Sequence, residues 1–173
     1  MLPLATGLAV CQTLRASGVE NLRLRWPNDV LIGDRKLAGL LIDQFKPGLA
    51  VVGIGINVCN QPQICDKSLS GQVVRLADLV SPAPSARDLA VHVLASLKIV
   101  WQQVLDYGPE VILERVNALW DLPRRVQLDL DGRLITGAFA GVDSSGRLRL
   151  QKKTNGAIQS FEPQDVRLLR DIP

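Results

Sequence analysis

The sequence has little of what builds several common kinds of site. Its 173 residues include one histidine, His92, and three cysteines, Cys11, Cys59 and Cys65. A single histidine argues against a structural zinc site, and an odd number of irregularly spaced cysteines does not look like a disulfide framework. We therefore expect a protein of a reducing compartment, the cytoplasm, in which His92 is a structural residue of a helix.

Long apolar runs and strong charge are also missing. No apolar run reaches the ~18 residues of a membrane-spanning helix, and the first residues lack the basic segment of a signal peptide. The net charge of +3 suits anionic ligands or an acidic protein partner, but it is too small for a typical nucleic-acid-binding surface. Because 47% of the residues are hydrophobic, a buried core is feasible. We expect no membrane association and a folded chain.

The hydrophobic pattern predicts an α+β fold in the first part of the chain. Apolar residues at helical spacing predict helices over 4–14, 85–105 and 111–120. Alternating residues and turn residues predict four strands joined by short turns, which favours antiparallel pairing. These strands cover residues 22–26, 30–32, 37–42 and 49–58. The fourth strand is apolar on both faces, so we expect both of its faces to be covered.

The pattern changes after Pro123. Asp131-Gly132 and Asn155-Gly156 are the residue pairs that a two-residue type I′ hairpin turn prefers. They lie among five short segments with strand character, 126–130, 134–142, 148–152, 157–161 and 166–169. Five short strands in a small segment predict a β-barrel. We therefore divide the chain into a larger domain, residues 1–122, and a small C-terminal β-barrel domain, residues 123–173.

Three short blocks carry the residues best suited to chemistry. They are Arg25-Trp26-Pro27-Asn28-Asp29, Arg35-Lys36-Leu37-Ala38-Gly39 and Gly53-Ile54-Gly55-Ile56-Asn57. Lys36 leads into an apolar strand, where its charge can hold a carboxylate or phosphate, although by spacing alone a solvated lysine on an edge strand is the commoner case. Asn28 and Asp29 either satisfy a local turn or face a phosphate-bound metal or a ribose.

Glycines and an asparagine mark the third block. Glycine weakens a strand interior, so Gly53 and Gly55 indicate a bulge or the close approach of another group to the backbone. The sequence has no GxGxxG motif, and a lone GxG specifies no ligand. Asn57 either ends the strand or offers its amide to a nucleotide. Trp26 is better explained as a core residue than as a stacking platform. Together, the blocks indicate a pocket for a small anion and a nucleotide.

In this order and spacing, the three blocks resemble the catalytic domain of biotin protein ligases. The resemblance extends to the C-terminal segment, where Gly141-Val142-Asp143-Ser144-Ser145-Gly146 is similar to the usual strand and turn. It implies a class II synthetase-like core, with a mixed or antiparallel sheet and helices, followed by a small β-barrel. It also implies that the protein makes biotinyl-5′-AMP from biotin and ATP with Mg²⁺. The biotin would then pass to a lysine of the biotin carboxyl carrier protein domain of a carboxylase.

The resemblance implies a role for each matching residue. Lys36 matches the catalytic lysine that contacts the biotin carboxylate and the phosphate formed from it. The positions that match biotin-binding residues are Lys36, Gly39, Gly53 and Gly55. The positions that match residues on the ATP and metal side are Arg25, Asn28, Asp29 and Asn57. The family usually has lysine where this chain has Arg25, and a planar guanidinium does not replace an ammonium freely.

The sequence also departs from the family. It has no Gly/Arg-rich loop to close over biotin, no Ser/Thr segment upstream of the blocks, and no helix-turn-helix, so we expect no DNA binding. We expect a ligase that is truncated in this chain, which alone would adenylate biotin poorly. The alternatives are a non-catalytic remnant or one half of a split ligase, and a barrel-bearing adaptor that binds nucleic acid or protein. Uncovered sheet edges would favour association with another chain, such as a homodimer.

Overall fold

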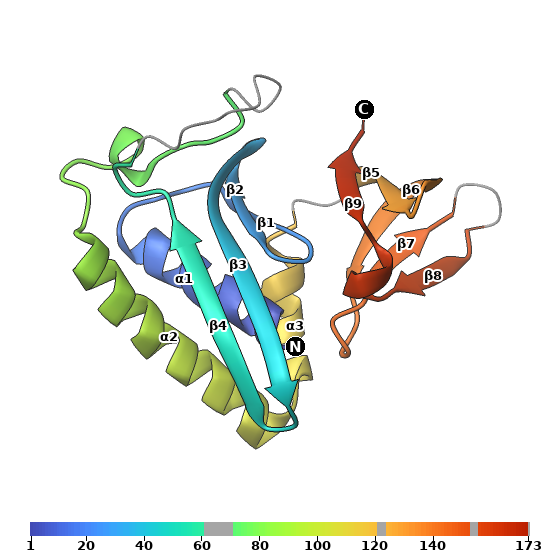
Figure 1. The fold of residues 1–173 in the computed structure, drawn as a ribbon, viewed down its shortest axis with the longest axis horizontal. Coiled ribbons are helices and arrows are strands. Elements are labelled where there is room, and N and C mark those ends of the chain that lie inside the picture. The colour runs from blue at the N-terminus through green and yellow to red at the C-terminus, as the bar shows by residue number, and fades with distance from the viewer. Residues whose placement is uncertain (61–70, 121–123, 153–155, 173) are drawn as a thin grey trace.

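The computed structural model describes residues 1–60, 71–120, 124–152 and 156–172 (Figure 1). The first part of the chain contains three α-helices and four strands. They are α1 Leu2–Ala16, β1 Leu22–Arg25, β2 Asp29–Ile32, β3 Arg35–Lys46, β4 Leu49–Ile56, α2 Ala86–Tyr107 and α3 Glu110–Asn117, with a 3₁₀ turn at Leu76–Asp78. The strands form one sheet in the order β1-β2-β3-β4, and each pair is antiparallel. The predicted α+β class with antiparallel strands is confirmed.

The helices pack against one face of this sheet. Figure 1 shows α1 behind β3 and β4, with α2 alongside it, and α1 contacts β1, β2, β3 and α2. A stretch of α1 is almost wholly buried, from Leu4 to Cys11 and again at Thr13 and Leu14. A Cβ at Gly7 would lie 2.8 Å from a methyl carbon of Leu24, so glycine allows α1 to approach β1 closely. The core of the domain lies between these helices and the sheet.

The other face of the sheet is open along much of β3 and β4 in the described part of the chain, whereas Arg23 and Leu31 of β1 and β2 are buried on it. Side chains along β4 alternate between exposed and half-buried, and Leu49 and Val51 on the exposed side are 49% and 54% exposed. On β3, Leu41 is 63% exposed. The expectation that both faces of the fourth strand are covered is therefore wrong for the described residues, because α1 and α2 lie on the same side of the sheet. β4 is also an edge strand, since β3 is its one partner in the described sheet.

The C-terminal segment forms a second antiparallel sheet. Its strands are β5 Arg124–Leu130, β6 Arg133–Val142, β7 Leu148–Gln151, β8 Ile158–Phe161 and β9 Leu168–Asp171, with a 3₁₀ turn at Pro163–Asp165. The strand order is β8-β7-β6-β5-β9, so β8 and β9 are the two edges and the described sheet is open. The five predicted strands are confirmed, whereas closure into a barrel is not.

Turns explain where these strands begin and end. Asp131 and Gly132 have φ of 52° and 90°, as a type I′ turn between β5 and β6 requires. Asn155 of the other predicted turn lies outside the described residues, and so does the predicted domain boundary at 122/123. The division into two domains therefore stays a prediction.

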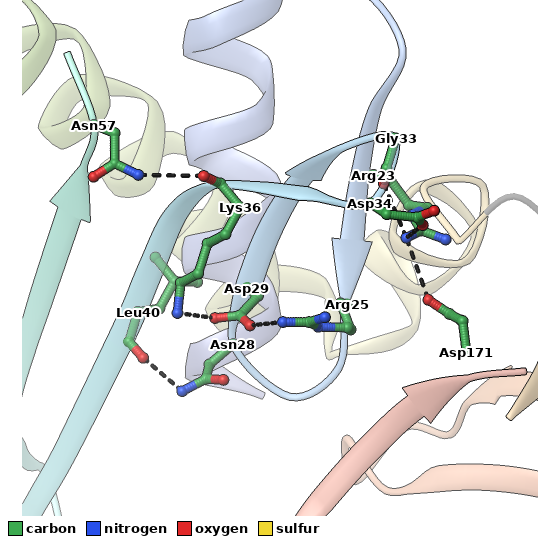
Figure 2. Close-up of polar contacts among 10 residues, drawn as sticks. All are labelled: Arg23, Arg25, Asn28, Asp29, Gly33, Asp34, Lys36, Leu40, Asn57 and Asp171. Carbon is green, nitrogen blue, oxygen red and sulfur yellow. Dashed lines mark hydrogen bonds and ion pairs between the residues drawn. The ribbon is translucent and has the colours of Figure 1, made fainter. Parts of the chain in front are cut away.

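Buried polar contacts connect the two sheets. The indole Nε1 of Trp26 donates to the carbonyl oxygen of Gly146 at 3.0 Å, and Trp26 is 2% exposed, which confirms it as a core residue. On the other side of β1, Arg23 Nη2 lies 3.3 Å from Asp171 Oδ2 (Figure 2). Within the C-terminal sheet, Arg124 Nε lies 3.1 Å from Asp171 Oδ1 and holds the same carboxylate. Because Arg23 lies in β1 and Trp26 begins the turn from β1 to β2, these contacts with the C-terminal segment help to hold the β1–β2 hairpin in place.

Candidate functional site

Strand register brings the three sequence blocks together. In the sheet, Arg25 is the partner of Asp29, Asp29 of Gly39, and Gly39 of Gly55. Residues directly opposite each other in antiparallel strands point to the same face. These residues therefore form one row across all four strands, and the exposure of Gly55 assigns the row to the open face of the sheet. The blocks are distant in sequence, yet they share one surface.

A chain of ion pairs runs along this row. The Asp29 carboxylate lies between two cations: its Oδ2 is 2.6 Å from Arg25 Nη2 and its Oδ1 is 2.5 Å from Lys36 Nζ (Figure 2). The Asp29 side chain is 13% exposed, whereas the Arg25 and Lys36 side chains are 34% and 43% exposed. The three charges sum to +1, and the two cations are more accessible to solvent than the carboxylate. The group can therefore attract an anionic ligand.

The backbone of Lys36 is anchored from two other segments. Its N–H donates to the carbonyl oxygen of Gln72 at 2.7 Å, and its carbonyl oxygen accepts from the N–H of Val74 at 3.0 Å. The same carbonyl accepts from Asn57 Nδ2 at 3.2 Å. β3 is an interior strand of the sheet, so the interpretation of Lys36 as an edge-strand lysine is wrong. No pattern in the sequence predicted the contact with residues 72–74, which follow a long polar segment.

Both asparagines of the blocks use their amides within the protein. Asn28 Nδ2 donates to the carbonyl oxygen of Leu40 at 2.8 Å, and the Leu40 N–H donates back to the Asn28 carbonyl at 2.8 Å. Asn57 donates to Lys36 as described. These bonds hold β3 near both ends of the segment 36–40. The backbone partner of the Asn28 amide lies twelve positions along the chain on β3, so this contact is not the local one expected of a turn residue.

Nothing in the described part of the chain requires glycine at positions 53 and 55. The β3–β4 register is regular from Ala38–Ile56 to Gln44–Ala50, so no bulge lies at either position. Neither glycine has the positive φ that favours this residue, and a Cβ built on each would meet its nearest neighbours at ordinary distances of 3.6 and 3.9 Å. The remaining explanation is close approach of another group to bare backbone. The two glycines leave a flat strip on the open face beside the ion pairs.

The remaining candidates for chemistry are less suited to it. Within the described ranges, no group of three or more His, Cys, Asp or Glu side chains could hold a metal ion, and both oxygens of Asp29 are already paired with cations. Burial raises the pKa of the Cys11 thiol to about 12, so Cys11 is not a nucleophile. Cys59 is exposed, and Cys65 lies outside the described residues. No described helix is long and apolar enough to cross a membrane.

Two cavities lie away from the ion pairs. One, of about 350 Å³, lies between β4 and α2 and is lined by apolar side chains that include Val52, Ile54 and Leu89. The other, of about 550 Å³, lies beside the β1–β2 hairpin and is lined in part by Arg23 and Arg124. Arg23 and Arg124 of the second cavity are already paired with Asp171. The ion pairs of Arg25, Asp29 and Lys36 thus lie on an open surface rather than in either of these cavities.

Comparison with known proteins shows which family the chain resembles. The model of the biotin/lipoate A/B protein ligase family matches residues 2–58, which include all three blocks. The chain is 32% identical over 153 residues to biotin–[acetyl-CoA-carboxylase] ligase of Mycobacterium tuberculosis, a match that covers 86% of this chain and 56% of the relative. The chain resembles the biotin protein ligase family over most of its length. It is also 29% identical to the bifunctional ligase/repressor BirA of Escherichia coli, over 96% of this chain and 52% of that protein.

Solved structures of the family share the fold. Biotin protein ligase from Aquifex aeolicus in complex with biotin and ATP aligns with a TM-score of 0.83 and 25% identity, over 99% of this chain and 71% of that chain. The alignment includes both sheets, so the C-terminal sheet belongs to the shared architecture. The chain spans about half the length of the curated relatives that it matches, 56% and 52% for the two named above.

Proposed function

We propose that this chain is part of a biotin protein ligase, which activates biotin with ATP to biotinyl-5′-AMP and transfers the biotin to a lysine of a biotin carboxyl carrier protein domain. One observation carries the proposal: Gly53 and Gly55 leave bare backbone on the open sheet face, next to the paired cations of Lys36 and Arg25. A flat apolar strip that ends at positive charge suits a ligand with an apolar body and a carboxylate. Biotin has this composition, and the resemblance to the biotin protein ligase family and the Aquifex aeolicus complex support the choice.

In the adenylation step, Lys36 is the catalytic residue. A biotin carboxylate oxygen attacks the α-phosphorus of ATP, the bond to the β,γ-pyrophosphate breaks, and negative charge develops on the oxygens at phosphorus. The Lys36 ammonium, moved from Asp29 to these oxygens, stabilises that charge. Biotin lies over Gly53 and Gly55, with its carboxylate toward Lys36. In the transfer step, the acceptor lysine amine attacks the acyl carbon of biotinyl-5′-AMP, and AMP leaves.

The ATP side of the site depends on Arg25 and on the residues that hold it. The Arg25 guanidinium is a third exposed and is anchored on Asp29, so it can reach a phosphate oxygen without leaving its carboxylate. Asn28 and Asn57 contribute by fixing β3, because their amide nitrogens are already bonded to its backbone. The described residues do not form a dedicated magnesium site. Mg²⁺ therefore enters bound to the phosphates of ATP, as part of the substrate.

We also propose that the chain pairs with a second copy along β4. The strand Leu49–Ile56 carries no proline and no charged residue, and its free edge is unpaired in the described sheet. Such an edge can pair with its own copy across a two-fold axis. A protein that remains a monomer by light scattering at all concentrations would remove this part of the proposal.

The test of the ligase proposal is biotin-dependent exchange of radiolabelled pyrophosphate into ATP by the protein that contains residues 1–173. Exchange requires reversible formation of the adenylate, so we expect exchange with biotin and none without it. Addition of a purified carrier domain and ATP should then give biotinylated carrier protein. Biotin binding without exchange would favour the alternative of a non-catalytic binding module, and the absence of both would overturn the proposal.

A further inference from the structure

We propose that Gly39 is a positioning residue for Lys36. Because residue 39 has no side chain, the Lys36 side chain can lie in the space that a Cβ would fill. The expected effect of a Gly39 substitution on catalysis rests on the proposed function, whereas its expected effect on the position of the Lys36 ammonium does not. This assignment differs from that of Gly53 and Gly55, which leave space for a ligand. The three glycines lie on the same face of the sheet, but their surroundings differ.

A β-bulge brings Lys36 and Gly39 to the same face. Val30 is paired with Ala38, but Leu31 is paired with Lys36, so Leu37 is an extra residue in β3. Leu37 and Ala38 are consecutive, yet both are buried, with 0% and 1% exposure. In a regular strand, residues three apart point to opposite faces. The bulge shifts this alternation by one residue and places Lys36 on the open face together with Gly39.

The lysine side chain then crosses Gly39 to reach its carboxylate. A Cβ built on Gly39 would lie 2.9 Å from Lys36 Cε and 3.0 Å from Lys36 Nζ. Both distances are shorter than an ordinary van der Waals contact. The same Cβ would lie 3.8 Å from Asp29 Oδ1, which is an ordinary distance. In Figure 2, the lysine side chain runs beside β3 toward Asp29. A methyl group at 39 would therefore displace the ammonium and leave the carboxylate in place.

The comparison with Gly53 and Gly55 makes the inference specific. A Cβ at Gly53 meets Leu41 at 3.6 Å, and a Cβ at Gly55 meets the Gly39 carbonyl oxygen at 3.9 Å. Alanine at these two positions therefore fits the chain itself. Any loss in Gly53→Ala or Gly55→Ala reports on a ligand over the strip, whereas Gly39→Ala acts on Lys36 even when no ligand is present.

The first experiment measures the lysine without biotin or ATP. The rate of trinitrobenzenesulfonate labelling at Lys36 is followed by peptide mass spectrometry in the wild type, Gly39→Ala and Gly53→Ala. We expect labelling to rise several-fold in Gly39→Ala, because the displaced ammonium leaves Asp29, and to stay unchanged in Gly53→Ala. Asp29→Asn should raise the rate in the same way, and Gly39→Ala should add little to it in the double variant. Wild-type labelling in Gly39→Ala would overturn the proposal whether or not the protein is a ligase.

The second experiment separates the two kinds of glycine by kinetics. In pyrophosphate exchange, Gly39→Ala should lower kcat about tenfold and change the KM for biotin less than about twofold, because it misplaces a group that acts in the transition state. Gly55→Ala should mainly raise the KM for biotin. An equal rise in KM in both variants would assign Gly39 to ligand contact instead. If Gly39→Ala lowers the Tm, the double variant with Lys36→Ala should regain it, because the clash is with the Lys36 side chain. A double variant whose Tm stays low would contradict the proposal.

Discussion

The two faces of the N-terminal sheet are built from the same strands and differ in almost every other respect. One face packs on α1 and α2 through fully buried side chains such as Leu37 and Leu14. The other carries glycines, two accessible cations and a mostly buried carboxylate. Because side chains alternate along a strand, one short sequence can specify a core and a binding surface together. The comparison indicates that the helix face provides stability and that the open face provides chemistry.

Removal of the Lys36 charge should give the largest effect and should leave the helix face intact. We expect Lys36→Ala to lower biotin-dependent pyrophosphate exchange about 10³-fold, because it removes a charge aimed at the reacting phosphate. Its free energy of unfolding should change by less than about 1 kcal/mol, since the lysine is 43% exposed. Lys46→Ala, an exposed lysine on the same strand, is the matched control. Equal activity in the two variants would remove Lys36 from the catalytic role.

Replacement of one leucine on each side of the sheet by alanine should show that the two faces contribute differently to the free energy of unfolding. Leu14 is 0% exposed and Leu41 is 63% exposed. We expect Leu14→Ala to lower the free energy of unfolding by about 3 kcal/mol, and Leu41→Ala by less than about 0.5 kcal/mol. Urea unfolding followed by circular dichroism measures both. If Leu41→Ala were as destabilising as Leu14→Ala, the face described as open would instead be packed.

The contact between the two sheets should give a smaller effect. Arg23 is 8% exposed and is paired with two carboxylates, Asp171 at 28% exposure and Asp34 at 90%. A buried cation that loses its less exposed partner is left poorly compensated. We expect Asp171→Asn to cost about 1 kcal/mol of unfolding free energy and Asp34→Asn to cost less than about 0.3 kcal/mol, because exposed pairs contribute little. Equal losses would show that burial of the carboxylate does not decide the strength of this contact.

The sequence predicted the elements well where local pattern determines them. Alternation gave the strands of the first sheet, and the pair Asp131-Gly132 gave the hairpin between β5 and β6. The helix predicted over 85–105 is confirmed as α2, and Ser85 accepts a hydrogen bond from the Asp88 N–H at its start. Closure of the second sheet was predicted but is not found. β8 and β9 follow each other in the chain, yet they lie at opposite edges of the described sheet, because β9 pairs with β5.

The site was predictable as a set of residues but not as an arrangement. The blocks contained Lys36 and Asp29, but their pairing depends on the β2–β3 register and on the extra residue Leu37. The consecutive apolar residues Leu37 and Ala38 were a signal of this bulge. Arg23 was visible as one member of an alternating strand, yet its partner Asp171 is 148 positions away, and no local pattern connects them. Apolar residues on both faces of β4 do not reveal which face the helices cover.

The central claim is that the open face, with Gly39, Gly53 and Gly55, is where biotin lies. The most direct measurement is a titration of ¹⁵N-labelled protein that contains residues 1–173 with biotin, followed through amide chemical shifts. We predict that the largest changes occur at these glycines and at Lys36, with little change along α1 on the opposite face. Changes concentrated on the helices or on the C-terminal sheet, with the three glycines unaffected, would contradict the account.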